Sequence, residues 1–298
     1  MTAIWMFTGQ GSLVPGCAQP LYEANAVFKE ALDRYTVALE RSVDVPLLGL
    51  LLDNHGAATE LVQQTQYGQP AVVALQLAQL AMWRDRGATP AVVLGHSVGE
   101  LAAAVAAGVM QPEDALRLAA VRGRVMSECR AGAMAAVMAP AERLLSSLPP
   151  EIVIAADNGP TMTVLAGTKD ALRAFLAERC RDPHTMLPVS HAFHSPLMEP
   201  AARAFREHVE TTALAEPRDV QLVSTMTGDV ETAQLRSPDY WIDQILRPVA
   251  FQRAVRTAWA LSPAASTVVE LGPASTLLQL AQRFVPDPDR QWIASSQA

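Results

Sequence analysis

The chain has 298 residues, of which 50% are hydrophobic and 18% charged, enough to form one large domain, or one large and one small, and too apolar for disorder. The net charge of −7 argues against nucleic acid as the main ligand, because proteins that grip phosphate backbones are usually basic. Three widely spaced cysteines (Cys17, Cys129 and Cys180) fit neither a disulfide framework nor a zinc site. Because the N-terminus lacks a basic signal segment and no apolar run reaches the ~20 residues that span a bilayer, we expect a cytoplasmic protein with no membrane partner.

The first part of the chain alternates short apolar runs with helical patterns. Residues 3–7 are predicted to form a buried strand that runs into the turn TGQGS, and residues 91–94 a strand that runs into the turn GHSVGE. Helices are predicted over residues 20–41, 45–52, 59–64, 69–86, 101–108 and 112–128. We place Pro70 in the first turn of the fourth of these helices, where its missing N–H costs nothing.

A separate unit is predicted over residues 131–190. Its predicted strands are 131–139, 152–156, 161–166 and 185–189, and its predicted helices are 140–147 and 170–179. This βαββαβ order is typical of a ferredoxin-like fold. We therefore expect a small ferredoxin-like subdomain at 131–190, inserted into a large subdomain made of residues 1–130 and 191–298.

The remainder of the chain continues the alternation of strands and helices. Strands are predicted over 220–224 and 267–271, and helices over 196–212, 238–246, 249–261 and 275–284. The pattern favours an α/β class with a parallel sheet, in which ligands bind beyond the carboxyl ends of the strands. Both glycine turns lie at such ends, and they could face one crevice.

The turn GHSVGE contains a candidate nucleophile. Gly95, Ser97 and Gly99 match the G-x-S-x-G nucleophile elbow, in which a tight strand-to-helix turn exposes the serine hydroxyl. The helix N-terminus behind it offers N–H groups to a developing oxyanion. A structural turn without chemistry is the alternative, and the position between a strand and a helix favours the nucleophile.

A serine nucleophile needs a base. The chain has six histidines: His55, His96, His184, His191, His194 and His208. His96 is next to the serine, but neighbouring side chains on such a turn diverge. His55 and His208 lie in polar or helical surface settings. His191 and His194, in VSHAFHSPLM at the return from the inserted unit, are the candidates for the base, although either could equally be structural.

The sequence indicates less clearly which charged residues would act together with a serine–histidine pair. Asp157 and Asp170 follow the serine in the order that a hydrolase triad requires, but a backbone carbonyl could take their place. Arg122, on the helix after the elbow helix, has two interpretations. It is either an exposed surface arginine or a fork that binds a substrate carboxylate through two hydrogen bonds.

Together these segments resemble the malonyl-CoA:acyl carrier protein transacylases of fatty acid synthesis and, more closely, the acyltransferase domains of polyketide synthases. The resemblance covers nearly the whole chain through FTGQGS, LYEANAVFKEALD, TQYGQPAVVALQLAQLAMW, GHSVGELAAAVAAGVM, AAVRGRVM, ADNGPTMTVLAG, HAFHSPLM, YWIDQILRPVAF and VVELGP. It implies an α/β-hydrolase-like core that carries a ferredoxin-like subdomain.

The resemblance also implies roles for individual residues. Ser97 is then the nucleophile, His194 the general base and acid, and Arg122 the group that binds the free carboxylate of the acyl unit. The backbone amides of Gln10 and Val98 form the oxyanion hole.

Further site residues follow from the same resemblance. His96 and Asn158 line or support the site, and backbone carbonyls near the LRPV segment orient the catalytic histidine. The HAFH tetrad, which contains His191 and Phe193, usually accompanies malonyl specificity. Phe193 would fill the space that the methyl group of methylmalonyl needs.

The implied activity is transfer of a malonyl unit from coenzyme A to the phosphopantetheine thiol of an acyl carrier protein, with no bound cofactor and no metal. We expect a free-standing monomer, although a domain excised from a larger synthase would look similar. Arg247, Arg253 and Arg256 either contact the carrier or form an ordinary solvated face. The alternatives are transfer of another acyl group or from another donor, an acyl-thioester hydrolase, and a non-catalytic module that docks carrier proteins.

Overall fold

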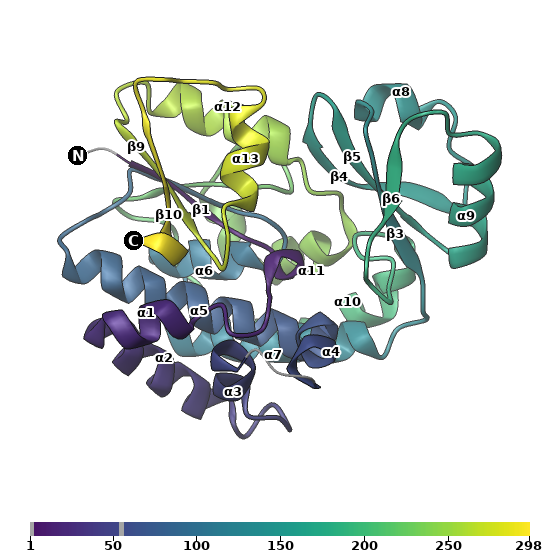
Figure 1. Ribbon diagram of the computed structural model, residues 1–298. Helices are drawn as coiled ribbons and strands as arrows, with labels where there is room; N and C mark the ends of the chain where they lie inside the picture. Colours follow the sequence, from purple (N-terminus) through teal and green to yellow (C-terminus); the bar gives the residue numbers. More distant parts are fainter. Residues whose placement is uncertain (1–2, 54–56) are drawn as a thin grey trace.

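The computed structural model describes residues 3–53 and 57–298 and contains a large and a small β-sheet (Figure 1). The large sheet has the strand order β10-β9-β1-β2-β7-β8, in which all neighbouring strands are parallel except β7 and β8. Its strands are β1 (Ala3–Phe7), β2 (Val92–Gly95), β7 (Gln221–Val223), β8 (Val230–Glu231), β9 (Thr267–Leu271) and β10 (Gln291–Ala294). The predicted α/β class with a parallel sheet is confirmed.

Helices cover both faces of the large sheet (Figure 1). Those of the large subdomain are α1 (Gln19–Ala24), α2 (Ala26–Leu39), α3 (Leu47–Leu52), α4 (Ala57–Gln63), α5 (Thr65–Asp85), α6 (Gly99–Ala106), α7 (Pro112–Ser127), α10 (Glu199–Glu210), α11 (Pro238–Leu246), α12 (Phe251–Leu261) and α13 (Thr276–Gln282). Because successive strand residues point to opposite faces, Trp5 and Phe7 pack with α5, α6 and α7, whereas Ile4 and Met6 pack with α12 and α13. The central strand is therefore apolar throughout.

The small sheet lies beside the large one, at the right in Figure 1. It is antiparallel, with the order β4-β5-β3-β6, and its elements are β3 (Ala133–Val137), α8 (Ala141–Leu145), β4 (Ile152–Gly159), β5 (Met162–Gly167), α9 (Lys169–Glu178) and β6 (His184–Met186). The βαββαβ order is confirmed, while the subdomain boundaries at 130/131 and 190/191 stay a prediction. Val249 joins the two parts, because its N–H donates to Ala155 and its carbonyl accepts from Asp157.

Several elements differ from those predicted. α5 begins at Thr65, so the placement of Pro70 in a first turn is wrong: Pro70 lies inside the helix. Gly68 lies inside this helix and allows close packing, since a Cβ on it would come within 2.7 Å of the Val62 carbonyl oxygen. The predicted helix 20–41 is two helices, divided at Asn25, whose side chain caps α2 by accepting from the N–H of Phe28. Neither β8 nor β10 was predicted from the sequence.

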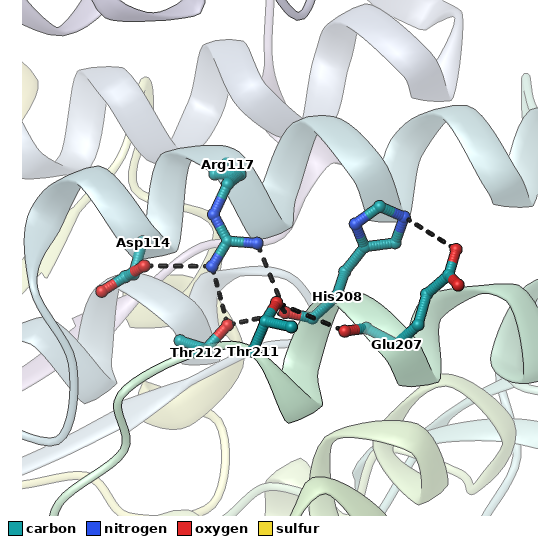
Figure 2. A network of polar contacts seen from close by, with 6 residues as sticks. All are labelled: Asp114, Arg117, Glu207, His208, Thr211 and Thr212. Carbon is teal, nitrogen blue, oxygen red and sulfur yellow. Dashed lines mark hydrogen bonds and ion pairs between the residues drawn. The ribbon is translucent and has the colours of Figure 1, made fainter.

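A polar network ties α7 to the C-terminal end of α10 (Figure 2). Arg117 on α7 donates to the carbonyl of His208 and to the hydroxyl of Thr212, and it forms an ion pair with Asp114. A cation at a helix C-terminus also interacts favourably with the helix dipole. Since α10 follows the HAFH segment and Arg122 lies on α7, this network fixes the spacing of two elements that reach the site.

Replacement of Arg117 by alanine is expected to lower the free energy of unfolding by about 1 kcal/mol, since the hydrogen bonds to a helix end are lost while the half-exposed ion pair adds little. Denaturant unfolding followed by circular dichroism measures this. Arg203→Ala is the matched control, because Arg203 makes only an exposed ion pair with Glu199 on the same helix. Equal stability of the two variants would show that the network does not couple α7 to α10.

Candidate active site

The elbow between β2 and α6 holds its serine in a conformation that few residues adopt. Ser97 has a φ of 53°, in the left-handed region. A Cβ on Gly95 would overlap the backbone of Gly99 and Glu100, and a Cβ on Gly99 would overlap the backbone of Phe7. Both glycines of the motif are therefore required by close backbone contacts, and the turn can exist only with glycine at these two positions.

His194 completes a pair with this serine. Its Nε2 lies 2.8 Å from the Oγ of Ser97, and its Nδ1 lies 2.9 Å from the carbonyl oxygen of Arg247. A carbonyl only accepts, so Nδ1 carries the proton and Nε2 is free to accept the serine proton. The carbonyl takes the place of a triad acid, and neither Asp157 nor Asp170 hydrogen-bonds to the ring.

The backbone of His194 shares the unusual geometry of Ser97. Its φ is 56°, and in the described part of the chain these two are the only non-glycine residues with a positive φ. Such conformations cost of order 1–3 kcal/mol each and persist only where the surrounding structure imposes them. The strain is thus concentrated at the two residues that form the pair.

The imidazole of His194 is held neutral. Its pKa is lowered to about 3, mainly by burial and in addition by the positive charge of Arg122 and by the neighbouring His96. The hydrogen bond to the Arg247 carbonyl acts in the opposite direction, because it favours the protonated ring. At neutral pH the ring is therefore present as a base.

Arg122 is a buried cation beside the pair. Its side chain is only 2% exposed, so its interpretation as a surface arginine is wrong. Nη1 donates to Gln69 at 2.6 Å, and Nη2 donates to Gln244 at 3.2 Å and to the Ser97 Oγ at 3.4 Å. Its Nε has no hydrogen-bond partner. Burial lowers its pKa to about 10, which leaves the guanidinium charged.

No carboxylate within the described residues forms an ion pair with Arg122. Glu100 interacts with it at longer range, but the Glu100 carboxyl is hydrogen-bonded to Tyr240 and Thr225. Burial also raises the pKa of Glu100 to about 7, so that it is only partly ionised at neutral pH. A buried charge without a counter-charge is costly, and a substrate carboxylate would relieve that cost.

Two glutamines that the sequence analysis did not single out orient the guanidinium. The amide nitrogen of Gln244 donates to the Ser97 carbonyl at 2.6 Å, which turns its oxygen toward Arg122. The amide nitrogen of Gln69 donates to Thr65, which in turn donates to the side chain of Gln10. Both glutamine oxygens are therefore fixed as acceptors, and Arg122 is connected to the elbow and to the TGQGS turn.

A pocket of about 420 Å³ opens onto Ser97, His194 and Arg122. Five other predicted site residues line it: Gln10, His96, Val98, Asn158 and Phe193. The Nε2 of His96 lies 2.9 Å from the Oδ1 of Asn158, so the two support each other across the large and small subdomains. The structure thus places eight of the nine predicted site residues around one cavity.

His191 is the exception. It does not line the pocket. Its ring nitrogens form hydrogen bonds with the Ser190 hydroxyl and the Cys129 carbonyl, and its ring stacks on that of Phe193 with the centroids 6.0 Å apart. In this structure His191 therefore lies behind Phe193, and its role in substrate binding stays a prediction. His208 lies beside Glu207 on α10, and His55 lies outside the described residues.

In residues 3–53 and 57–298, no group of three or more His, Cys, Asp or Glu side chains is arranged to hold a metal ion. No helix in those segments is both long enough and apolar enough to cross a bilayer.

Comparisons with known proteins show the family of this chain. Polyketide synthase GfsA of Streptomyces halstedii is 42% identical over 286 residues, which are 93% of this chain but 4% of that synthase. The acyltransferase domain from the second module of the salinomycin polyketide synthase superposes with a TM-score of 0.87 at 34% identity, over 98% of this chain and 68% of that one. Malonyl CoA-acyl carrier protein transacylase from Burkholderia pseudomallei superposes with a TM-score of 0.83 at 30% identity, over 96% of this chain and 100% of that one. The acyl transferase domain family matches residues 4–291, and the chain belongs to that family.

Proposed function

We propose that this protein transfers a malonyl unit from coenzyme A to the phosphopantetheine thiol of an acyl carrier protein, through an ester on Ser97. The observation that carries the proposal is the buried Arg122, a cation without an ion-pair partner among the described residues, beside the Ser97–His194 pair. Such a cation selects an acyl group that ends in a carboxylate. The names of the related transacylase and synthases support the same chemistry.

In the first half-reaction, the Ser97 oxygen attacks the thioester carbonyl while its proton moves to the Nε2 of His194. The negative charge that develops on the carbonyl oxygen is stabilised by the backbone N–H groups of Gln10 and Val98, which line the pocket. Collapse of the tetrahedral intermediate breaks the C–S bond. The thiolate of coenzyme A leaves with the proton from His194, and a malonyl-serine ester remains.

The second half-reaction reverses these steps with another thiol. His194 takes the proton of the phosphopantetheine thiol, the sulfur attacks the ester carbonyl, and the Ser97 oxygen leaves with that proton. Ping-pong kinetics follow from the shared intermediate. A hydrolase of simple acyl thioesters has no use for Arg122, and a module that only docks carriers has no use for the Ser97–His194 pair, which disfavours both alternatives.

Phe193 supports malonyl over methylmalonyl as the acyl group. Its half-buried ring lines the pocket and is backed by His191, so it cannot withdraw freely to admit a methyl group. Exclusion of one methyl is worth about 1–3 kcal/mol, so we propose a preference with some leakage.

Intact-mass measurement after brief incubation with malonyl-CoA, methylmalonyl-CoA and acetyl-CoA in competition tests the proposal. A malonyl adduct is expected on the wild type and none on Ser97→Ala, because the ester bond requires the hydroxyl. Ser12→Ala is the matched control, since Ser12 lines the pocket but bonds only to Gly9.

Each other outcome has a definite meaning. An acetyl adduct in preference to a malonyl adduct would contradict the selection of a carboxylate by Arg122. A methylmalonyl adduct in preference to a malonyl adduct would contradict the exclusion of the methyl group by Phe193. An adduct that still forms on Ser97→Ala would show that Ser97 is not the nucleophile. No adduct from any thioester, together with release of free malonate, would favour the hydrolase.

The proposal includes the setting of the enzyme. We propose that it acts as a monomer in the cytoplasm, where its three free cysteines would stay reduced. The large subdomain (1–130 and 191–298) would supply the pair and Arg122, and the small subdomain (131–190) one wall of the pocket. The partner is an acyl carrier protein, recognised through its phosphopantetheine arm.

A further inference from the structure

The elbow motif GHSVGE ends with an acid that the proposed mechanism does not use. Glu100 lies in the first turn of α6, shortly after Ser97, and it is 0% exposed. A buried carboxyl is costly unless polar groups surround it, and an apolar residue would pack in the same place at lower cost. The role of Glu100 therefore lies in the contacts that its carboxyl makes.

These contacts come from two segments that lie much later in the chain. One carboxyl oxygen accepts a hydrogen bond from the hydroxyl of Tyr240 on α11. The other accepts from the backbone N–H of Thr225, in the turn after β7, at 3.2 Å, and lies 3.0 Å from the hydroxyl of the same residue. Because both partners are buried, they supply the hydrogen bonds that water makes to an exposed carboxyl.

Thr225 connects Glu100 to the other end of the elbow. Its hydroxyl donates to the carbonyl of Gly95 at 2.6 Å, and Gly95 is the last residue of β2. The first and the last residue of the motif GHSVGE are thus fixed to the same threonine. This contact holds the elbow itself in shape.

Tyr240 connects Glu100 to the group that holds Arg122. Tyr240 precedes Gln244 by four residues on α11, a spacing that places both side chains on one face of the helix. Gln244 donates to the Ser97 carbonyl at 2.6 Å and accepts from the Nη2 of Arg122 at 3.2 Å. The elbow therefore contacts α11 at two points one helical turn apart, through Glu100 and through Ser97.

We propose that Glu100 is a positioning residue for the choice of acyl group: through Tyr240 it fixes the rotation of α11, so that Gln244 holds the guanidinium of Arg122 toward Ser97. Two contacts one turn apart fix a helix about its own axis, whereas a single contact lets it turn. Neither Glu100 nor Tyr240 lines the pocket, so both act through Gln244. The inference rests on the proposed function, in which Arg122 binds the carboxylate of the acyl unit.

Tyr240→Phe tests this role and keeps the ring, which packs edge-on against Trp241. Loss of the hydroxyl frees α11, so kcat/KM for acylation by malonyl-CoA is expected to fall about tenfold, comparable to one hydrogen bond lost in a buried site. For acetyl-CoA, which has no carboxylate, kcat/KM should stay within about twofold of the wild type. Tyr35→Phe is the matched control, because Tyr35 is a buried tyrosine on α2 that does not line the pocket.

Variants of Glu100 separate its contact with Tyr240 from its charge. Glu100→Leu removes both, and it is expected to lower the malonyl-to-acetyl ratio of kcat/KM as Tyr240→Phe does. Glu100→Gln removes only the charge, since an amide can still bond to Tyr240 and Thr225, and it should restore most of the ratio. A Glu100→Gln variant with as low a ratio as Tyr240→Phe would show that Glu100 acts through its charge, and it would overturn the proposal even where Glu100→Leu fails to fold.

A double-mutant cycle tests whether the effect passes through Gln244. In Gln244→Leu the group that Tyr240 positions is already missing, so addition of Tyr240→Phe should lower the malonyl-to-acetyl ratio no further. In Gln69→Leu the same addition should lower the ratio again, because Gln69 holds the other terminal nitrogen of Arg122 from α5. Losses that multiply in the Gln244→Leu background would overturn the proposal.

The remaining outcomes for Tyr240→Phe are also decisive. An equal loss with both acyl groups would show that the contact with Glu100 supports only the fold, and an unchanged ratio would contradict the positioning role. Both results would leave the proposed function intact, since the wild type would still form the malonyl ester on Ser97. Failure of the wild type to form that ester would instead remove the proposed function, and the positioning role with it.

Discussion

Replacement of His194 by alanine is expected to slow formation of the acyl-enzyme at Ser97 by roughly 10²–10⁴-fold, the range typical for loss of a general base. Among the residues that the structure describes, the 2.8 Å contact between Nε2 and the serine Oγ is the only one through which a side chain can take the serine proton. Arg122 also contacts that oxygen, but a guanidinium cannot act as a base at neutral pH. Rapid-quench measurement of the malonyl-enzyme gives the rate directly.

His208→Ala is the control, since His208 is a partly exposed histidine whose ring contacts only Glu207. A variant of His194 that acylates as fast as this control would contradict the role of the pair. The protonation state can be checked separately in the wild type. Because burial places the pKa of His194 at about 3, its ring resonances in an NMR titration should not move near pH 6.5.

The same pKa has a consequence for stability. The unfolded chain binds a proton on this residue near pH 6.5, whereas the folded protein binds it only near pH 3. Between these values the unfolded state holds more protons, so the contribution of His194 opposes folding increasingly as the pH falls and vanishes above pH 6.5.

Replacement of Arg122 by leucine is expected to reverse the choice of acyl group. Acylation by malonyl-CoA should fall roughly 10²-fold or more, because the substrate carboxylate would lose its counter-charge in a buried site. Acylation by acetyl-CoA should be unchanged or faster, since its methyl group would meet an apolar side chain. The ratio of the two kcat/KM values is the measurement.

Arg124→Leu is the matched control for charge and helix position, because Arg124 is exposed on the same helix. An equal loss with both substrates would mean that Arg122 serves mainly to hold the Ser97 hydroxyl, through the 3.4 Å contact from Nη2. That result would contradict the selection of a carboxylate by Arg122, and it would leave the role of Ser97 as the nucleophile unaffected.

The sequence was most informative where local steric rules apply. The elbow glycines, the βαββαβ order, β9 and α11 are set by short-range patterns, and the structure reproduces them. β10 was missed because it is a short, partly exposed edge strand, Gln291–Ala294. Pro70 was misplaced because α5 begins at Thr65, ahead of the predicted start at Gln69.

The site required information that local patterns do not contain. Composition gave no means to choose between His191 and His194, and only the resemblance favoured the second. The burial of Arg122 depends on contacts with Gln69 and Gln244, which are 53 and 122 positions away from it in the chain. Gln244 had one usable signal, since it is a polar residue on the buried face of α11, with Tyr240 and Trp241. A buried glutamine requires partners, and here they are the nucleophile and the cation.

The two left-handed residues have a consequence for how the protein tolerates change. Ser97 and His194 are unfavourable in isolation, so the chain around them must spend some of its folding free energy to keep them as they are. A variant with a slightly looser scaffold would let these backbones relax first, and would lose turnover while its sheets and helices were still intact. Conversely, substitutions that relax this turn would raise the melting temperature and abolish transfer. Thermostability and turnover therefore compete at Ser97 and His194. Selection for thermostability alone would first change the backbone of these two residues.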